Sequence, residues 1–562
     1  MLLFCSITFG QSWQWIKRGG SIANPENSFS FSETITAMET DNQGNVYVVS
    51  PVTQYGLDID GNTKTGYGFK DDVIASFTCD GNYRWSTIVG GAGNDRILNI
   101  KVDSNGDVFA VMNISWGNEF DAIYHFDAST TIPLVFENQK ILCFAKYNGQ
   151  TGNVLWYKFL QADGLTPIQY SQSSINSLDI DNNNNLYLFC SFINGVYYDG
   201  AFNNTSSGSN KFILKCDNNG NFISASNPFQ ASYSNGNYYS PYNIKRSPLN
   251  GKYYYRFSSL NSYNGITVQP NQKFFLMCIS SNGNFEWLKT VSFTNTGNRA
   301  FTDMKIDNDG FIYLSGGGVI GDDVGGFVIT GTSTYDCPFL LKLDPDGNVI
   351  WGSNATMTPG AASEEICRLG INGNQIAVSP YFHAITWGGN YPHIPNNGRD
   401  SSLFMFNKTN GSFISNTRLT STSGVSERIN QITSDIHGNY IVGGYFETNI
   451  TANSTTLNSV GGGSDFFVAK YGSNNCTLSN EEQEQNIKKA VLFPNPAHET
   501  IFINTNEKVG YTIFNLLGKK VATGYVDNVQ VPIPVTQLAS GSYIMQIKDN
   551  NNKIKQVKFV KN

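Results

Sequence analysis

One hairpin pattern returns about every 65 residues along most of the chain. Each copy is an alternating apolar run, then a turn rich in Asp, Asn and Gly, then a second alternating run, which is typical of a β-hairpin. The clearest copies are residues 35–49, 97–111, 175–189, 301–315 and 429–443, and weaker copies are residues 242–257 and 366–379.

A second hairpin pattern lies between copies of the first, and its turn glycines are spaced 63 to 71 residues apart. Two hairpins per period give four strands, which is the make-up of one blade of a β-propeller. Seven periods therefore predict an all-β fold, a seven-bladed β-propeller over residues 12–472 with four strands per blade. The turn glycines of the second pattern are Gly81, Gly152, Gly220, Gly283, Gly347 and Gly411.

The seventh period lacks its fourth strand, because it ends at residues 465–475. An isolated segment with the pattern of a fourth strand, SWQWIKRGG, stands at Ser12–Gly20. We therefore predict that the N-terminal strand completes the last blade. Such closure leaves the ring of sheets without an open edge.

Composition narrows the class of protein further. Only 14% of residues are charged, the net charge is −7 and the pI is near 5.4, which argues against a basic nucleic-acid-binding protein. The abundance of Gly, Asn and aromatic residues argues against a mostly helical fold. Apolar residues make up 40% of the chain, enough to form a core, so charge-driven disorder is not expected.

The repeated segments resemble the propeller repeats known as SBBP repeats, through their D-x-x-G-N-x-Y and F-x-x-K-x-x-x-x-G-N-x-x-W patterns. The resemblance covers most of residues 12–471. It implies the propeller architecture and leaves the activity open, because propellers serve many unrelated functions.

The end of the chain has a different pattern. Residues 473–490 are polar and predict a linker, whereas residues 491–562 contain short alternating strands typical of a small Ig-like β-sandwich. The two parts also differ in charge, since residues 491–562 carry eight Lys and four acidic residues.

Residues 491–562 closely resemble the type A C-terminal sorting domain (Por secretion tail) of the type IX secretion system of Bacteroidetes. The resemblance implies recognition by the secretion machinery, passage through the periplasm to the outside or the cell surface, and proteolytic removal of the tail. The alternative is an ordinary Ig-like accessory domain. The motif positions are Pro494, Asn495, Pro496, Gly518, Leu538, Gly541, Tyr543 and Lys558.

The N-terminus and the cysteines give weaker signals. Residues 1–11 read as the truncated end of a signal peptide, with a buried strand as the alternative, and no segment has the length of a membrane helix. The nine cysteines form no CxxC pair. Buried thiols are expected, and one disulfide between neighbouring strands remains open without an assignment.

Motifs for chemistry are sparse. The sequence contains no nucleophile elbow, P-loop or H-E-x-x-H motif, so we predict no catalytic residue, metal or cofactor. A metal or acid/base site is conceivable at Asp121, His125 and Asp127, but a solvated loop fits this spacing better. The paired acids at 179/181 and 344/346 vaguely resemble the ligands of a calcium site. They recur at hairpin turns, so turn chemistry explains them better.

The long loops between second and third strands, and between blades, share one face of the predicted propeller. Loops on a rigid scaffold often carry function, and aromatic residues there suit contacts with sugars or protein loops. The alternative is that these rings pack beneath their own loops. The predicted binding residues are Trp116, Tyr124, Tyr197, Tyr198, Tyr238, Tyr239, Trp387 and Tyr391.

Two functions follow from this assignment. The first is a secreted or surface-attached, non-catalytic binding or adhesion module, expected to be a monomer, for a glycan or protein ligand. The second is an extracellular polysaccharide hydrolase or lyase.

Overall fold

The computed structural model separates the chain into two compact units, Met1–Cys476 (unit 1) and Thr477–Asn562 (unit 2). Every secondary-structure element in the described part of the chain is a β-strand. No helix there is long and apolar enough to cross a membrane. The described residues are 10–562 except 23–32, 54, 69, 116–122, 134–139, 161–172, 199, 206–209, 228–243, 261, 264–265, 295–300, 332–336, 358–362, 383–384, 388–391, 394–399, 422–426, 461–462, 474–475, 477–491, 505–507, 516–518, 528–530 and 549–553.

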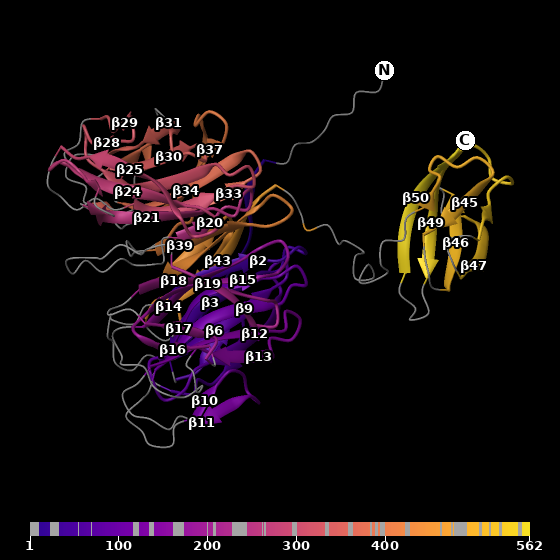
Figure 1. Cartoon of the computed structure of the whole chain (residues 1–562), viewed down its shortest axis with the longest axis horizontal. Coiled ribbons are helices and arrows are strands. Elements are labelled where there is room, and N and C mark those ends of the chain that lie inside the picture. Colours follow the sequence, from indigo (N-terminus) through magenta and orange to yellow (C-terminus); the bar gives the residue numbers. More distant parts are fainter. Residues whose placement is uncertain are drawn as a thin grey trace. The chain divides into compact units, whose positions relative to one another are not determined.

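Within these residues, unit 1 contains seven antiparallel sheets that each hold four strands in hairpin order (Figure 1). Sheet 1 is β2 (Ala37–Thr40), β3 (Val46–Thr53), β6 (Lys70–Phe77) and β7 (Tyr83–Val89). Sheet 2 is β8 (Arg96–Val102), β9 (Val108–Ser115), β12 (Lys140–Tyr147) and β13 (Val154–Phe159). Sheet 3 is β14 (Ser174–Ile180), β15 (Leu186–Phe192), β18 (Asn210–Cys216) and β19 (Phe222–Ser226).

Sheets 4 to 7 repeat this order. Sheet 4 is β20 (Ile244–Arg246), β21 (Tyr253–Leu260), β24 (Gln272–Ile279) and β25 (Phe285–Ser292), extended by β28 (Asp323–Val324) and β29 (Phe327–Val328). Sheet 5 is β26 (Phe301–Ile306), β27 (Ile312–Gly318), β30 (Cys337–Leu343) and β31 (Val349–Asn354). Sheet 6 is β33 (Ser363–Asn372), β34 (Gln375–Phe382), β37 (Asp400–Asn407) and β38 (Phe413–Arg418).

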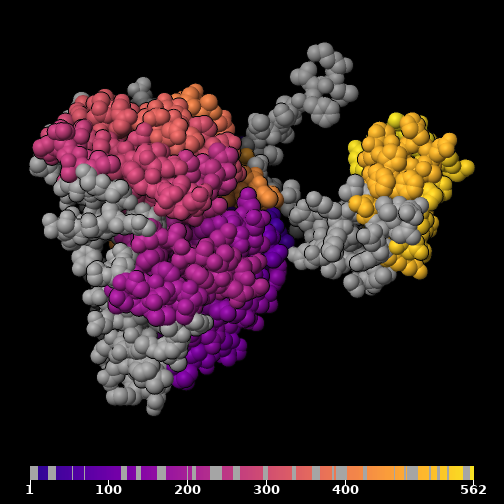
Figure 2. Space-filling model, in the orientation of Figure 1, coloured from indigo at the N-terminus to yellow at the C-terminus, as the bar shows by residue number. Residues whose placement is uncertain are grey.

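Sheet 7 joins the two ends of unit 1. It is β39 (Glu427–Ser434), β40 (Tyr440–Phe446), β43 (Asp465–Gly472) and β1 (Ser12–Ser21), extended by β4 (Leu57–Ile59) and β5 (Asn62–Lys64). The predicted pairing of the N-terminal strand with the last period is therefore confirmed, since β1 runs antiparallel to β43 from Ser12 opposite Gly472 to Gly19 opposite Phe466. Figure 2 accordingly shows indigo atoms from the start of the chain next to orange atoms from the end of unit 1.

Further short strands lie in the loops between the main strands of unit 1. They are β10 (Ile123–His125), β11 (Thr131–Pro133), β16 (Gly195–Tyr197), β17 (Phe202–Asn204), β22 (Ser262–Tyr263), β23 (Ile266–Thr267), β32 (Thr356–Met357), β35 (Ile385–Thr386), β36 (Pro392–His393), β41 (Asn449–Ala452) and β42 (Thr455–Asn458).

Successive sheets contact one another around a closed circuit, mostly through their first strands. Contacts join β39 to β2, β2 to β8, β8 to β14, β20 to β26, β26 to β33 and β33 to β39. Sheets 3 and 4 meet through the rings of Tyr187 and Tyr253, whose centroids are 6.3 Å apart. Buried apolar clusters fill the space between successive sheets.

The repeated G-N-x-x-W pattern explains how neighbouring sheets are spaced. The Trp of a fourth strand lies against the turn glycine of the next sheet, as Trp85 does against Gly152 and Trp351 against Gly411. The same contact joins Trp15 to Gly81, so it also crosses the junction between sheet 7 and sheet 1. These glycines have positive φ and leave room for the ring, which a Cβ would fill.

The repeated D-x-x-G-N-x-Y pattern closes the first hairpin. In sheet 1, one oxygen of Asp41 accepts hydrogen bonds from the backbone N–H groups of Gln43 and Asn45. The other accepts the hydroxyl hydrogen bond of Tyr47 at 2.9 Å. Equivalent bonds recur at Asp181 and Asp307. The Asp residues are therefore occupied by turn hydrogen bonds, as expected of Asx turns.

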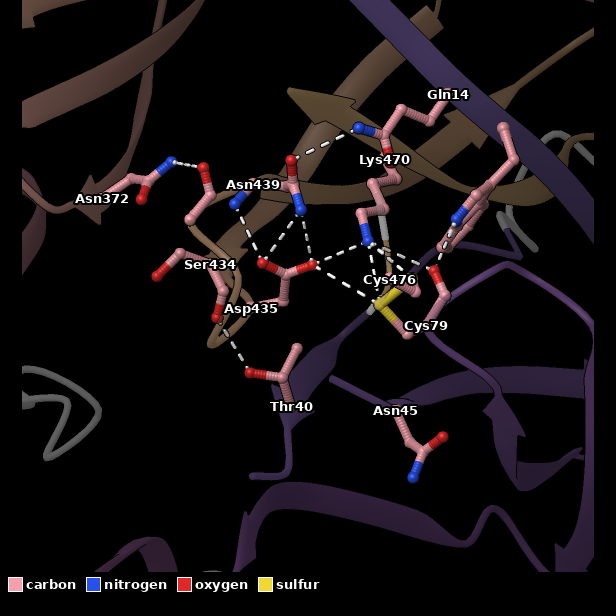
Figure 3. Close-up of polar contacts among 12 residues, drawn as sticks. Gln14, Thr40, Asn45, Cys79, Asn372, Ser434, Asp435, Asn439, Lys470 and Cys476 are labelled. Atoms are coloured by element: carbon pink, nitrogen blue, oxygen red, sulfur yellow. Dashed lines mark hydrogen bonds and ion pairs between the residues drawn. A yellow bond between two sulfur atoms is a disulfide. The ribbon is translucent and has the colours of Figure 1, made fainter. Parts of the chain in front are cut away.

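A disulfide between Cys79 and Cys476 ties the end of unit 1 to the third-to-fourth-strand turn of sheet 1. Figure 3 shows Lys470 between this disulfide and the carboxylate of Asp435. Both charged side chains are fully buried, and the Lys470 Nζ lies 2.8 Å from Asp435 Oδ2. The remaining cysteines in the described part are buried and are not in disulfides: Cys143, Cys190, Cys216, Cys278, Cys337 and Cys367.

Unit 2 consists of two antiparallel sheets that share one hydrophobic core. One holds β44 (Leu492–Phe493), β45 (Thr500–Ile503) and β48 (Ile533–Pro534). The other holds β47 (Lys520–Val526), β46 (Val509–Asn515), β49 (Gly541–Lys548) and β50 (Ile554–Lys561) in that order.

Candidate functional site

A cavity of about 340 Å³ lies where the first strands of the seven sheets meet. Every sheet contributes to its lining, from Thr36 beside β2 to Gln431 on β39. Because residues from all seven sheets line this cavity, we call it the axial cavity. Its other lining residues are Arg96, Ile97, Leu98, Asn99, Ser177, Lys245, Arg256, Thr302, Asp303, Met304, Lys305 and Arg368.

A recurring β-bulge sets which residues of the first strands line the cavity. The pairing register shifts between Ile97 and Asn99 in sheet 2, between Phe301 and Asp303 in sheet 5, and at the same place in sheets 3 and 7. A bulge inserts one unpaired residue and re-aims the side chains that follow. The residue after the shift lines the cavity in each of these four sheets.

The lining is rich in positive charge. Three arginines come from alternate sheets, Arg96 from sheet 2, Arg256 from sheet 4 and Arg368 from sheet 6. Lys245 and Lys305 add two ammonium groups, whereas the one carboxylate among the described lining residues is Asp303. The cavity is therefore cationic, although the chain as a whole is acidic.

The surroundings shift the pKa values of several of these groups. Burial and the nearby Lys101 and Lys305 lower the pKa of Lys245 to about 8. Burial also lowers the pKa of Arg256 to about 10. Burial acts to raise the pKa of Asp303, but Lys305 and Arg368 outweigh it and bring the pKa below its ordinary value. Asp303 is therefore an anion that is already neutralised by its neighbours.

The Nε atoms of Arg96 and Arg368 are buried and have no hydrogen-bond partner among the described residues. Burying an N–H group without a partner costs stability, so these two arginines are kept at a cost to the fold.

A second cavity of about 370 Å³ adjoins the first, because Lys245 and Lys305 line both. It lies at the end where the first strands turn, and its lining includes the turn residues Asn182, Asn183 and Pro248. Lys101 and Asp179 also line it, and Lys101 forms an ion pair with Glu39. The two cavities are thus neighbours that share Lys245 and Lys305, and together we call them the axial channel.

The structure places four of the predicted aromatic binding residues in the core. Tyr124, Tyr197, Tyr198 and Trp387 are buried, and none lines the axial channel. Tyr197 stacks on Phe192, and the Trp387 indole donates a hydrogen bond of 2.9 Å to Ser353. These contacts are packing contacts, so a binding role for these four residues stays a prediction. Trp116, Tyr238, Tyr239 and Tyr391 lie outside the described residues.

Two of the three weaker polar candidates, His125 and Asp127, make structural contacts. His125 stacks on Tyr67 with ring centroids 3.7 Å apart, and burial lowers its pKa. One oxygen of Asp127 accepts hydrogen bonds from the N–H groups of residues 129 and 130, which holds the loop. Asp121 lies outside the described residues. No group of three metal-binding side chains occurs within the described part of the chain.

The predicted sorting-domain residues mostly support the fold of unit 2. Asn495 Oδ1 accepts a hydrogen bond of 2.9 Å from the N–H of Val560, which fastens the Pro494–Pro496 segment to β50. The Tyr543 ring is buried, and its hydroxyl donates to the carbonyl of Ala539 at 2.8 Å. Leu538 packs against the core, Gly541 and Lys558 are exposed, and Gly518 lies outside the described residues.

Sequence reasoning missed the axial channel. The available signal was the polar or charged residue inside each otherwise apolar first strand, such as Lys101, Lys245 and Lys305 at corresponding positions of three repeats.

Among solved structures, the chain is similar to a quinohemoprotein alcohol dehydrogenase from Comamonas testosteroni, with 10% identity, a TM-score of 0.38, and 87% of this chain and 79% of that chain covered. It is also similar to BamB from Moraxella catarrhalis, with 10% identity, a TM-score of 0.27, and 82% and 100% covered. Likenesses this distant assign no activity to the chain. No curated protein matches it.

Residues 491–562 match the family of the secretion system C-terminal sorting domain. The match spans unit 2 from β44 to the last residue and agrees with the resemblance in its sequence. It indicates secretion by the type IX system, and with it contact with the secretion machinery and an extracellular or cell-surface location. Residues 491–562 are therefore a member of the C-terminal sorting-domain family.

Proposed function

We propose that this protein is an exported, non-catalytic binding protein in which unit 1 is a seven-bladed β-propeller of the SBBP-repeat type. Seven four-stranded sheets in one circuit, closed by β1, support this architecture. We propose the boundaries 1–11 for a signal peptide, 12–472 for the propeller, 473–490 for a linker and 491–562 for an Ig-like sorting domain.

The observation that carries the binding function is the axial channel. It is built by residues from all seven sheets, and its charged groups are fixed in place by a rigid scaffold. Such preorganised concave sites are where proteins hold small ligands or the ends of longer ones. The ligand is an extracellular molecule, a glycan or a protein segment, because the sorting domain directs the chain out of the cell.

The same site supports binding better than hydrolysis. Asp303 is kept ionised by Lys305 and Arg368, so it is poorly suited to donate a proton to a leaving group. The positive charge around Asp303 suits binding of a ligand rather than its cleavage.

The test is to apply the purified full chain to arrays of glycans and extracellular proteins and to assay the bound glycans for breakdown. Saturable binding without products supports the proposal. Release of shortened products, abolished in Asp303→Asn, would instead make the protein a polysaccharide hydrolase or lyase.

A further inference from the structure

We propose that the axial channel binds an oxyanion with two or more negative charges, either a free small polycarboxylate or the charged end of an acidic glycan. This inference rests on the proposed binding function and adds the chemical class of the ligand.

The first support is the imbalance of charge in the axial cavity. Five cationic side chains and one carboxylate line the axial cavity, and that carboxylate is already shared by Lys305 and Arg368. Asp72 acts on Arg96 and Asp179 acts on Lys245 from outside the lining, so five cations still outnumber three nearby carboxylates. Like charges held together away from bulk water repel one another strongly. An anion with a single charge would leave most of this repulsion in place, whereas a multiply charged anion would relieve it.

The second support is the direction from which the arginines come. Arg96, Arg256 and Arg368 belong to sheets 2, 4 and 6, so they approach the cavity from three sides. A guanidinium group binds carboxylate, sulfate or phosphate oxygens through two parallel hydrogen bonds. Three such groups from three sheets therefore suit a ligand with several anionic oxygens.

The third support is size. The axial cavity of about 340 Å³ corresponds to roughly ten water molecules at about 30 Å³ each. This space suits a compact polycarboxylate or one sugar unit. The adjoining cavity lies next to it on the side of the turns, and four cationic side chains line it against the carboxylates of Asp179 and Asp181.

The experiment is isothermal titration calorimetry on the purified full chain with three probes, citrate, trigalacturonate and the neutral trisaccharide maltotriose. Chloride keeps the ionic strength constant. Arg368→Gln and, separately, Arg96→Gln each remove one channel guanidinium. Arg418→Gln is the matched control, because it removes an exposed arginine charge on β38 outside the channel. Tryptophan fluorescence checks that each variant is folded.

We expect citrate or trigalacturonate to bind one per chain and maltotriose not to bind. Each channel variant should weaken binding at least about tenfold, since a hydrogen bond to a charged group contributes about 1.5–3 kcal/mol. The Arg418→Gln variant should bind as the wild type does. Binding of citrate identifies the free acid as sufficient, and binding of trigalacturonate alone identifies the glycan end.

Other results would contradict the oxyanion inference, the proposed function or both. If a neutral glycan binds and both channel variants leave its affinity unchanged, the oxyanion inference fails and the binding function stands. If trigalacturonate is degraded, the non-catalytic function fails and the ligand class stands. If no glycan, protein or anion binds, both fail.

Discussion

At the scale of single residues, Glu33 and Asp465 are acids buried beside each other where β1 meets β43. Gly20 lies between them, since a Cβ there would approach both carboxyl groups within 2.6 Å. Burial is the main cause that raises the pKa of Glu33 to about 8 and that of Asp465 to about 7. Their ordinary values are 4.5 and 3.8, so the folded state holds these protons more tightly than the unfolded chain.

This pair predicts a pH dependence of stability. When the folded pKa of an acid is raised, the free energy of unfolding falls as pH rises from the unfolded pKa to the folded one. For Glu33 this window runs from 4.5 to about 8. Glu33→Gln removes this titration, so the difference in unfolding free energy between pH 5 and pH 9 should shrink.

Urea unfolding followed by tryptophan fluorescence measures this difference in unit 1 alone, because all eight tryptophans precede residue 477. Asp80→Asn, an exposed acid in a turn, is the control and should keep the wild-type difference. An unchanged difference in Glu33→Gln would show that Glu33 is not protonated in the folded protein at neutral pH.

At the scale of elements, the contact between a fourth-strand Trp and the next turn glycine sets how sheets pack. Gly152 has φ 74°, and an added Cβ would overlap the buried ring of Trp85, whose indole donates a 3.0 Å hydrogen bond to the carbonyl of Gly149. Gly152→Ala should therefore destabilise unit 1 by about 2–4 kcal/mol, combining backbone strain with overpacking.

Gly61 provides the matched control for this substitution. Its φ of 87° is also positive, but a Cβ there would meet no atom within 4 Å. Gly61→Ala should cost only the backbone strain, about 1–2 kcal/mol. Urea unfolding measures both variants, and equal losses would show that the Trp85 contact does not limit the spacing of the sheets.

The elements also show what the sequence can predict. Hairpin turns such as Asp41–Tyr47 were predictable because the hydrogen bonds that Asp41 accepts are local. Closure by β1 was predictable because one period lacks a strand. The axial channel was not, because the bulge between Ile97 and Asn99 breaks strict alternation and the partners of Arg368 come from other sheets. Nor does an alternating pattern reveal that Trp387 folds back into the core.

At the scale of the whole molecule, the Cys79–Cys476 disulfide links residues 397 positions apart and so encloses most of unit 1. Disulfides persist in oxidising compartments, which agrees with export. Reduction by dithiothreitol should lower the melting temperature of unit 1, with a loss of about 2–4 kcal/mol. Cys476→Ser should show the same loss and no further response to dithiothreitol. A Cys476→Ser variant as stable as the oxidised wild type would mean that strand pairing with β1 suffices for closure.

The division into two units leads to a prediction about export. Unit 2 has its own core, with Ile513, Met545 and Phe559 buried in it, and the structure of unit 1 does not require it. Deleting residues 491–562 should therefore leave the tryptophan emission and urea midpoint of unit 1 unchanged while the protein stays inside the cell envelope. Immunoblotting of medium, surface-exposed and envelope fractions from the native host measures this. Asn495→Ala loses the contacts that fasten the Pro494–Pro496 segment to β50, so it should reduce export less than the deletion does. If the deleted chain still reached the medium, a signal within unit 1 would direct its export.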